Sequence, residues 1–244
     1  MSISVTYEHE GRVARLTYDN SARGNCFSTA QLRELVEALE AAAAEPVRAV
    51  IRLDMAGRHF CGGWDTTSFA GLLDESEGAV ADALRASDAL LDRIRALPVP
   101  VVAGVRGRII GFGVGLLSAL HLPVVASDAR ASLPEVQFGF APAGVGHVVT
   151  QALPRAQAYA LLCGLTTATG RQLLTWGLAS RMAEPADLDT AVDDVIDALL
   201  AVPGDALRGV VEVVESSLRT GRPDRAYEIS ARTIVDGRHK GGES

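Results

Sequence analysis

The chain has 244 residues, enough for one large domain or for a domain with an appendage. Hydrophobic residues make up 48% of it and charged residues 22%, which is typical of a soluble protein with a substantial core. A formal net charge of −7 argues against a nucleic-acid partner and against an anionic membrane surface.

The N-terminal segment MSISVTYEHEGR lacks the apolar stretch of a signal peptide, and no apolar run approaches membrane-spanning length. The three cysteines, Cys26, Cys61 and Cys163, have neither CxxC nor metal-ligand spacing. We therefore expect a cytoplasmic protein with reduced thiols, no metal site and no membrane contact.

The first hundred residues predict three strands and two helices. Residues 4–7 and 13–18 predict two paired strands, and residues 47–54 predict a third. Ser28 predicts the N-cap of a helix. The apolar residues with helical spacing in the two predicted helices are Leu32, Leu35, Val36 and Leu39, then Leu84, Leu90, Leu91, Ile94 and Leu97.

The central stretch from Val101 to Gly146 predicts a buried strand that leads directly into a glycine-rich turn. The turn glycines are Gly111, Gly113 and Gly115, and the leucines that follow predict a buried helix. Glycine lets backbone N–H groups approach a ligand, and the N-terminus of the helix points at the same place. This geometry stabilises negative charge.

The remainder predicts mainly helix. The predicted helices cover residues 148–153, 156–163, 170–176 with Thr169 as N-cap, 187–202, 206–219 and 225–235, followed by a frayed polar tail over 238–244. The strand-rich first half and helical last quarter favour an α/β core with a helical appendage.

Five motifs, in this order, resemble those of the crotonase family of enoyl-CoA hydratases and isomerases. They are Asn25, at the family's N-A-L position; His59-Phe60-Cys61-Gly62-Gly63-Trp64-Asp65, like its F-x-x-G-x-D turn; Val105-Arg106-Gly107 with Gly111-Phe112-Gly113, like V-x-G…G-G-G; Leu133-Pro134-Glu135 with Gly139, Pro142 and Gly146, like P-E-x-x-x-G-x-x-P-x-x-G; and Gly164…Thr169…Gly177-Leu178, like T-G…A…G-L-V. The resemblance extends from Val5 to Met182.

This resemblance implies a spiral core of repeated ββα turns over residues 1–185 and a C-terminal helical region over 186–244 that packs trimers. It implies an acyl-CoA thioester, or an acyl-carrier-protein thioester, as substrate. Coenzyme A is then part of the substrate, and no separate cofactor is expected. The expected assembly is a homotrimer or a dimer of trimers.

The resemblance also implies that the backbone N–H groups of Trp64 and Gly113 form an oxyanion hole, with Gly63 and Gly111 as thioester-binding positions beside them. A thioester carbonyl that gains enolate charge needs such fixed donors. The alternative is that both glycine turns only pack tightly. Trp64 is larger than the family's usual residue there, which indicates either an aromatic-walled pocket or core packing.

Glu135 matches the family glutamate that acts as acid and base beside the thioester α-carbon. Its apolar neighbours favour desolvation and a raised pKa, although a solvated glutamate at a strand end is the alternative. Family hydratases use a second glutamate at the position of Gly115, where this chain has none. The space left there is expected to admit a bulkier or branched acyl group.

A single carboxylate suits the movement of one proton between two carbons, so double-bond isomerisation of an enoyl-CoA is the leading prediction. A decarboxylase or another biosynthetic lyase, a hydratase with one glutamate, and a catalytically silent acyl-CoA-binding homologue stay open. Replacing Glu135 by glutamine separates the silent binder from the enzymes.

Other residues rank lower. Arg23 and Arg58 are candidates for the coenzyme A phosphates because guanidinium groups suit phosphate, with solvated surface residues as the alternative. The remaining candidates, each with a structural role as its first interpretation, are Asp65, His121, His147, Cys61 and His239, the last in the tail.

Overall fold

The computed structural model describes residues 1–67, 71, 75–221 and 224–241, with side chains described up to residue 234. The main sheet has the strand order β1-β2-β3-β4-β6-β9. Its strands are β1 (Ser2–Glu8), β2 (Val13–Asp19), β3 (Val50–Met55), β4 (Val101–Val105), β6 (Leu122–Ala126) and β9 (Arg181–Ala183). Only β1 and β2 pair antiparallel; the other neighbours are parallel.

A second, smaller sheet consists of β5 (Arg108–Ile110), β7 (Arg130–Ser132) and β8 (Ala168–Thr169). Isolated parallel bridges extend this sheet: Cys61 pairs with Ile109, and Trp64 pairs with Phe27. A main-sheet strand is therefore followed repeatedly by a short second-sheet segment and then by a helix. This is the predicted spiral of ββα turns.

The helices are α1 (Thr29–Ala43), α3 (Glu77–Arg95), α4 (Phe112–Ala119), α5 (Gly144–Ala152), α6 (Arg155–Leu162), α7 (Gly170–Thr175), α8 (Leu188–Leu200), α9 (Gly204–Thr220) and α10 (Asp224–Gly241). Three short 3-10 turns are η1 (Ser21–Arg23), η2 (Glu135–Phe138) and η3 (Pro185–Asp187). The predicted N-caps Ser28 and Thr169 are confirmed, because each closes a capping box with the glutamine three residues later.

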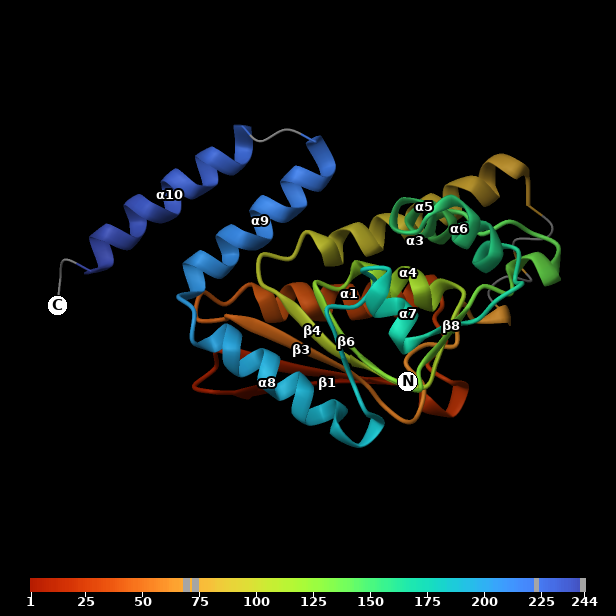
Figure 1. Cartoon of the computed structure of the whole chain (residues 1–244), viewed down its shortest axis with the longest axis horizontal. Helices are drawn as coiled ribbons and strands as arrows, with labels where there is room; N and C mark the ends of the chain where they lie inside the picture. Colours follow the sequence, from red (N-terminus) through yellow and green to blue (C-terminus); the bar gives the residue numbers. More distant parts are fainter. Residues whose placement is uncertain (68–70, 72–74, 222–223, 242–244) are drawn as a thin grey trace.

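The two faces of the main sheet differ in chemistry. Leu16 and Leu53 lie on the face that packs against α1 and are completely buried. Arg52 lies on the opposite face, towards α8, because side chains alternate along a strand. Figure 1 shows α8 crossing this face.

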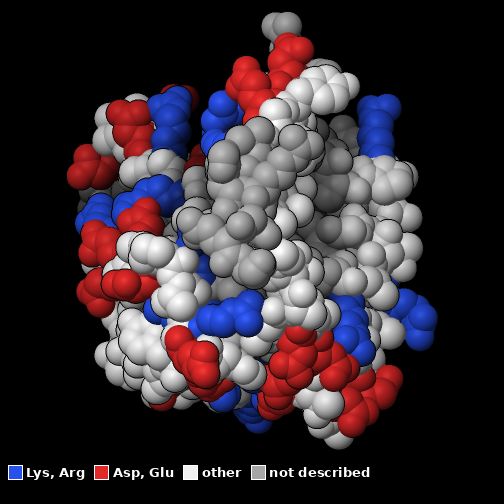
Figure 2. Space-filling model, turned by 90° about the vertical axis from the view of Figure 1, so that its left-hand side faces the viewer, with Lys and Arg blue, Asp and Glu red and all other residues white. Residues whose placement is uncertain are grey.

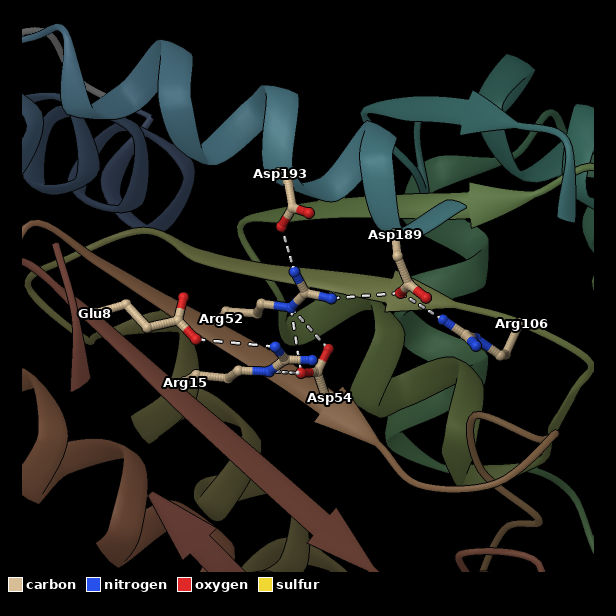
Figure 3. A network of polar contacts seen from close by, with 7 residues as sticks. All are labelled: Glu8, Arg15, Arg52, Asp54, Arg106, Asp189 and Asp193. Atoms are coloured by element: carbon tan, nitrogen blue, oxygen red, sulfur yellow. Dashed lines mark hydrogen bonds and ion pairs between the residues drawn. The ribbon is translucent and has the colours of Figure 1, made fainter. Parts of the chain in front are cut away.

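A network of charged side chains joins α8 to the sheet (Figure 3). The Arg52 side chain is 4% exposed and bonds Asp54 at 2.9 Å, together with Asp189 and Asp193 of α8. Arg106, just after β4, bonds Asp189 at 2.7 Å. Helix α8 is thus fixed to the core by charge as well as by its apolar face, which buries Leu188, Val192 and Ile196.

Helices α9 and α10 form a hairpin beyond the sheet (Figure 1). On the face of the molecule shown in Figure 2, acidic and basic residues are interspersed and do not separate by sign. No helix of the described part is both long and apolar enough to cross a bilayer. The boundary between residues 185 and 186 stays a prediction.

Three predicted element boundaries are wrong. The strand at Val101 does not lead directly into the glycine turn, because the chain bends at Gly107 (φ +63°) and forms β5 first. Helix α5 begins at Gly144, four residues before the predicted start. Helix α10 continues to Gly241 through the tail predicted to fray; residues 242–244 lie outside the described range.

Candidate functional site

Two turns bring the site together, one around Gly63 and one around Gly111. Cys61 N–H donates to the Arg108 carbonyl at 3.2 Å, and Ile110 N–H donates to the Cys61 carbonyl at 2.9 Å. The turns are therefore neighbours across the second sheet, although about fifty residues separate them in the chain.

Glycine is required for this close approach. A Cβ at Gly63, where φ is +94°, would lie 3.0 Å from the Ile110 carbonyl oxygen, and one at Gly113 would lie 2.9 Å from the Cys61 Cβ. Both glycines are thus tightly packed, as the alternative to a functional role predicts. It also holds the two backbones rigidly together.

The backbone N–H groups of Trp64 and Gly113 are among those of these turns that have no acceptor in the described part of the chain. The Gly63 carbonyl and the Asp65 N–H both bond Phe27, so the Trp64 N–H points to the other side of the chain. Gly113 is the second residue of α4, where helical N–H groups lack an intrahelical partner. Both donors are available to an oxyanion.

The Glu135 carboxylate lies against the second turn. Glu135 opens η2 and is 9% exposed, and a Cβ at Gly111 would come within 2.7 Å of its Oε1 atom. Its Oε2 atom is buried with no hydrogen-bond partner in the described part of the chain. Burial raises the pKa of this carboxyl. The prediction of a desolvated glutamate is confirmed, and the solvated alternative is wrong.

The position of Gly115 is closed. A Cβ there would lie 3.0 Å from Val145 Cγ2 and 3.2 Å from Leu91 Cδ1. The expectation that this glycine leaves room for a bulkier acyl group is therefore wrong, because α3 and α5 fill the space with apolar side chains. Helix α4 itself carries no carboxylate.

Trp64 is half-buried, and its ring lies 4.2 Å from that of Phe112, centroid to centroid. Phe112 lies 6.0 Å from Phe27 in an edge contact. A row of aromatic rings therefore lies beside the Trp64 backbone. This contact is the core packing that was the alternative interpretation of Trp64; the aromatic-walled pocket stays a prediction.

Arg23 and Arg58 lie at the outer end of the first turn. Arg23 is 56% exposed and bonds Asp65 at 3.1 Å, and Asp65 also accepts from Thr67 N–H at 3.0 Å. Asp65 thus holds the turn, as predicted. Arg58 lines a cavity of about 210 Å³ together with Ser21, Gly24, Asn25, Ala56 and His59.

The sequence indicates Asn25 only through its place in a family motif, and the structure shows that it bonds the backbone around the first turn. Its side-chain amide donates to the carbonyls of Ala56 and His59 at 2.8 Å each and accepts from Asn20 N–H at 3.0 Å. The residue adopts φ +57°, which asparagine tolerates better than most residues. It fixes the approach to the first turn.

The structure describes the surroundings of His121, His147 and Cys61. His121 is half-buried between the Val101 N–H, 3.0 Å from Nδ1, and the Arg95 carbonyl, 3.1 Å from Nε2, so both ring nitrogens have partners, as expected. His147 is exposed on the first turn of α5. Burial raises the pKa of the Cys61 thiol to about 12, so it stays protonated. His239 lies outside the residues whose side chains are described.

Asp88, on α3, is a residue that the sequence analysis missed. It is half-buried, and a Cβ at Gly144 would overlap both of its carboxylate oxygens. Burial raises its pKa, and Asp92 adds to the shift, while Arg95 and His147 oppose it. The only signal in the sequence is its position three residues before Leu91, on the same side of the helix.

Comparison with known proteins extends the resemblance to nearly the whole chain. The family model "Enoyl-CoA hydratase/isomerase" matches residues 8–239. A probable enoyl-CoA hydratase of Bacillus subtilis is 32% identical over 69% of this chain and 64% of its own length. A mitochondrial methylglutaconyl-CoA hydratase of Pyricularia oryzae is 30% identical over 73% of this chain and 52% of its own length.

The matched segments thus span less than two thirds of these two relatives. A crystal structure of an enoyl-CoA hydratase from Mycobacterium smegmatis superposes with a TM-score of 0.85 at 22% identity, covering 96% of this chain and 90% of that one. This likeness confirms the predicted fold.

Proposed function

Since the chain belongs to the enoyl-CoA hydratase/isomerase family, we propose that it is an enzyme that moves the double bond of a 3-enoyl-CoA thioester to the 2 position. The observation that carries the proposal is Glu135. Its carboxylate is desolvated, has one unpartnered oxygen among the described residues and lies beside the second oxyanion turn.

The thioester oxygen binds between the N–H groups of Trp64 and Gly113. Glu135 removes a proton from C2, and the charge that develops on the oxygen is stabilised by these two donors and by the N-terminus of α4. Glu135 then returns the proton to C4. Its raised pKa suits both halves of this transfer, because the carboxyl must accept and release the same proton.

The absence of a carboxylate at Gly115 supports isomerisation over hydration. Addition of water calls for one group that activates the water and another that handles the α-proton. Leu91 and Val145 cover Gly115 with hydrocarbon, so α4 supplies no second group. Proton transfer within the substrate needs only Glu135.

Hydration is the second candidate, favoured by the names of the two relatives described above. A decarboxylation through the same enolate and silent acyl-CoA binding are further outcomes that the test below distinguishes. For the substrate, we propose coenzyme A held by Arg23 and Arg58, with no separate cofactor. The acyl-carrier-protein thioester is the alternative.

We also propose a homo-oligomer, a trimer or a dimer of trimers, in the cytoplasm. Val210, Val214 and Leu218 lie four residues apart along α9 and are 59%, 47% and 77% exposed. Such a row of apolar side chains suits an interface between subunits. Light scattering on the purified protein tests the assembly, and a monomeric mass would contradict it.

The decisive experiment follows deuterium uptake and product identity in heavy water. The panel contains 3-enoyl-, 2-enoyl-, saturated and malonyl-type CoA thioesters. Isomerisation predicts conversion of the 3-enoyl to the 2-enoyl thioester, with a loss of at least about a hundredfold in Glu135→Gln. Glu34→Gln, on the exposed face of α1, is the matched control and retains activity.

Each other outcome has its own meaning. A hydrated product from the 2-enoyl thioester would favour the hydratase, and carbon dioxide from the malonyl-type thioester would favour the decarboxylase. Binding without exchange or turnover would favour the silent homologue or a carrier-protein substrate. Any of these without isomerisation overturns the proposal.

A further inference from the structure

Phe138 is a large apolar side chain that the fold leaves exposed beside the proposed acid/base group. Its exposed fraction is 73%, whereas that of Glu135, three residues earlier, is 9%. The two residues are the last and the first of the 3-10 turn η2. A phenyl ring in water contributes nothing to the hydrophobic stabilisation of the fold, so its position here calls for another explanation.

The exposed apolar surface continues around this turn. Val136 and Phe140 are each 41% exposed. Leu165 is 81% exposed and follows Gly164, where a Cβ would lie 3.6 Å from Val136 Cγ2. Single exposed apolar residues are common on protein surfaces, whereas a contiguous group of them indicates a binding surface.

The geometry of η2 places Phe138 beside the carboxylate. A 3-10 helix has three residues per turn, so the side chains of Glu135 and Phe138 project in the same direction, about 6 Å apart along the axis. Gly139 closes the turn with φ +86°, and its N–H donates to the Val136 carbonyl at 3.2 Å. Phe140 N–H donates to the Glu135 carbonyl at 3.3 Å. The turn that carries both side chains is thus fixed by its own backbone bonds.

The proposed reaction sets the direction in which the acyl chain leaves the carboxylate. C1 lies between the N–H groups of Trp64 and Gly113, and C2 and C4 both meet Glu135. Beyond C4 the chain cannot turn inwards along α4, because the space at Gly115 is so closed that even a Cβ would lie 3.0 Å from the nearest side chain. The chain is therefore directed outwards along η2, where Phe138 is the next side chain on the same side as the carboxylate.

We infer that Phe138 determines specificity for the length of the acyl chain, by packing its ring against the methylene groups beyond C4. The inference rests on the proposed thioester site, and it names the substrate class as thioesters of medium- or long-chain apolar acyl groups. Each methylene group that the ring covers leaves water, and only a chain that extends past Glu135 gains this burial. A short acyl group ends before the ring and leaves it exposed.

The first test compares 3-hexenoyl-CoA with 3-decenoyl-CoA. The wild type is expected to prefer the longer substrate by about fifteenfold in kcat/KM, because each of the four additional methylene groups contributes about a factor of two when the ring covers one side of it. Phe138→Ala is expected to reduce this ratio to about twofold, and Phe138→Leu, which keeps an apolar side chain, to retain most of it. An equal ratio in the wild type and in Phe138→Ala would overturn the inference.

Controls separate recognition of the chain from other roles of Phe138. Tyr159→Ala removes an aromatic ring of 59% exposure from α6 and is expected to leave the ratio unchanged. Equal losses on both substrates in Phe138→Ala would mean that the ring only supports the turn that carries Glu135. A lower molecular mass of Phe138→Ala in light scattering would mean that a second copy of the chain covers the ring. Either result would overturn the inference.

Binding separates this inference from the proposed reaction. The saturated analogues hexanoyl-CoA and decanoyl-CoA cannot isomerise, and their dissociation constants are measured by calorimetry on the wild type and on Phe138→Ala. A preference for decanoyl-CoA that Phe138→Ala reduces supports the inference even if no isomerisation is found. A preference that persists unchanged in the variant contradicts it, whatever the activity.

Discussion

The Glu135 carboxylate rests on the Cα atom of Gly111, so that a single added methyl group would come within 2.7 Å of Oε1. The proposed acid/base group and the start of α4, which is proposed to stabilise the oxyanion, are thus direct neighbours. The position of one fixes the position of the other.

Gly111→Ala is expected to lower kcat/KM by about a hundredfold, because the added methyl group pushes the Glu135 carboxylate out of its position. The backbone at Gly111 has φ +53°, so the variant is also expected to lose stability. Steady-state kinetics on the 3-enoyl thioester and chemical unfolding measure the two effects. Gly78→Ala, with open space on α3, is the control; it should leave kcat/KM unchanged and should not lower stability.

The raised pKa of Glu135 predicts a pH-dependent activity. The carboxylate is the reactive form, so kcat/KM is expected to fall as the pH is lowered through a pKa above the ordinary 4.5 of glutamate. A pH profile that stays flat down to the ordinary value would contradict the desolvated site.

The same shift predicts that Glu135→Gln is more stable than the wild type at neutral pH. A carboxyl whose folded pKa is raised favours folding only while it is protonated, and this contribution is lost as the pH rises through the folded pKa. The advantage of the glutamine variant is therefore expected at pH 7 and should disappear below about pH 4.5. Thermal unfolding at the two pH values measures it.

His121 predicts acid sensitivity of the fold. Burial lowers its pKa, and Nδ1 accepts a hydrogen bond from Val101 N–H, which a proton on Nδ1 would prevent. Since the unfolded chain binds the proton more readily, stability is complete above the ordinary pKa of 6.5 and declines as the pH falls below it. His121→Gln is expected to cost about 2 kcal/mol at pH 7.5 and to flatten this decline, measured by urea unfolding.

Arg52→Ala is expected to destabilise the fold by about 2 kcal/mol, because Asp54 loses its buried partner and α8 loses its ion pairs to β3. The loss is smaller than for a fully buried pair, because Asp189 and Asp193 are exposed. Arg85→Ala removes an exposed pair with Asp82 and should cost at most about 0.5 kcal/mol. Equal losses would show that the network in Figure 3 is only a surface feature.

The sequence predicts the parts of this protein that depend on local pattern. Ser28 and Thr169 mark helix starts by the chemistry of their side chains, and the strand at Val101 follows from its β-branched run. These features need no knowledge of distant contacts.

The parts that the sequence does not predict depend on tertiary contacts. From the sequence, Gly115 suggests open space, but Leu91 of α3 and Val145 of α5 fill that space in the structure. Asp88 looks like an ordinary exposed helix residue, because its contact with Gly144 spans more than fifty positions. Strand β5 is three residues long and exists because it pairs with β7, which no local pattern announces.

The bond from Arg52 to Asp193 joins residues 141 positions apart, and this separation has a consequence for synthesis. While a ribosome makes the chain, the strands of the main sheet emerge long before α8. During that interval the side of the sheet that α8 will cover is bare, and the Arg52 guanidinium has Asp54 but neither α8 carboxylate. The nascent protein therefore carries a positively charged, partly apolar surface that vanishes once residues 188–200 leave the exit tunnel, so aggregation during translation is most dangerous just before that point.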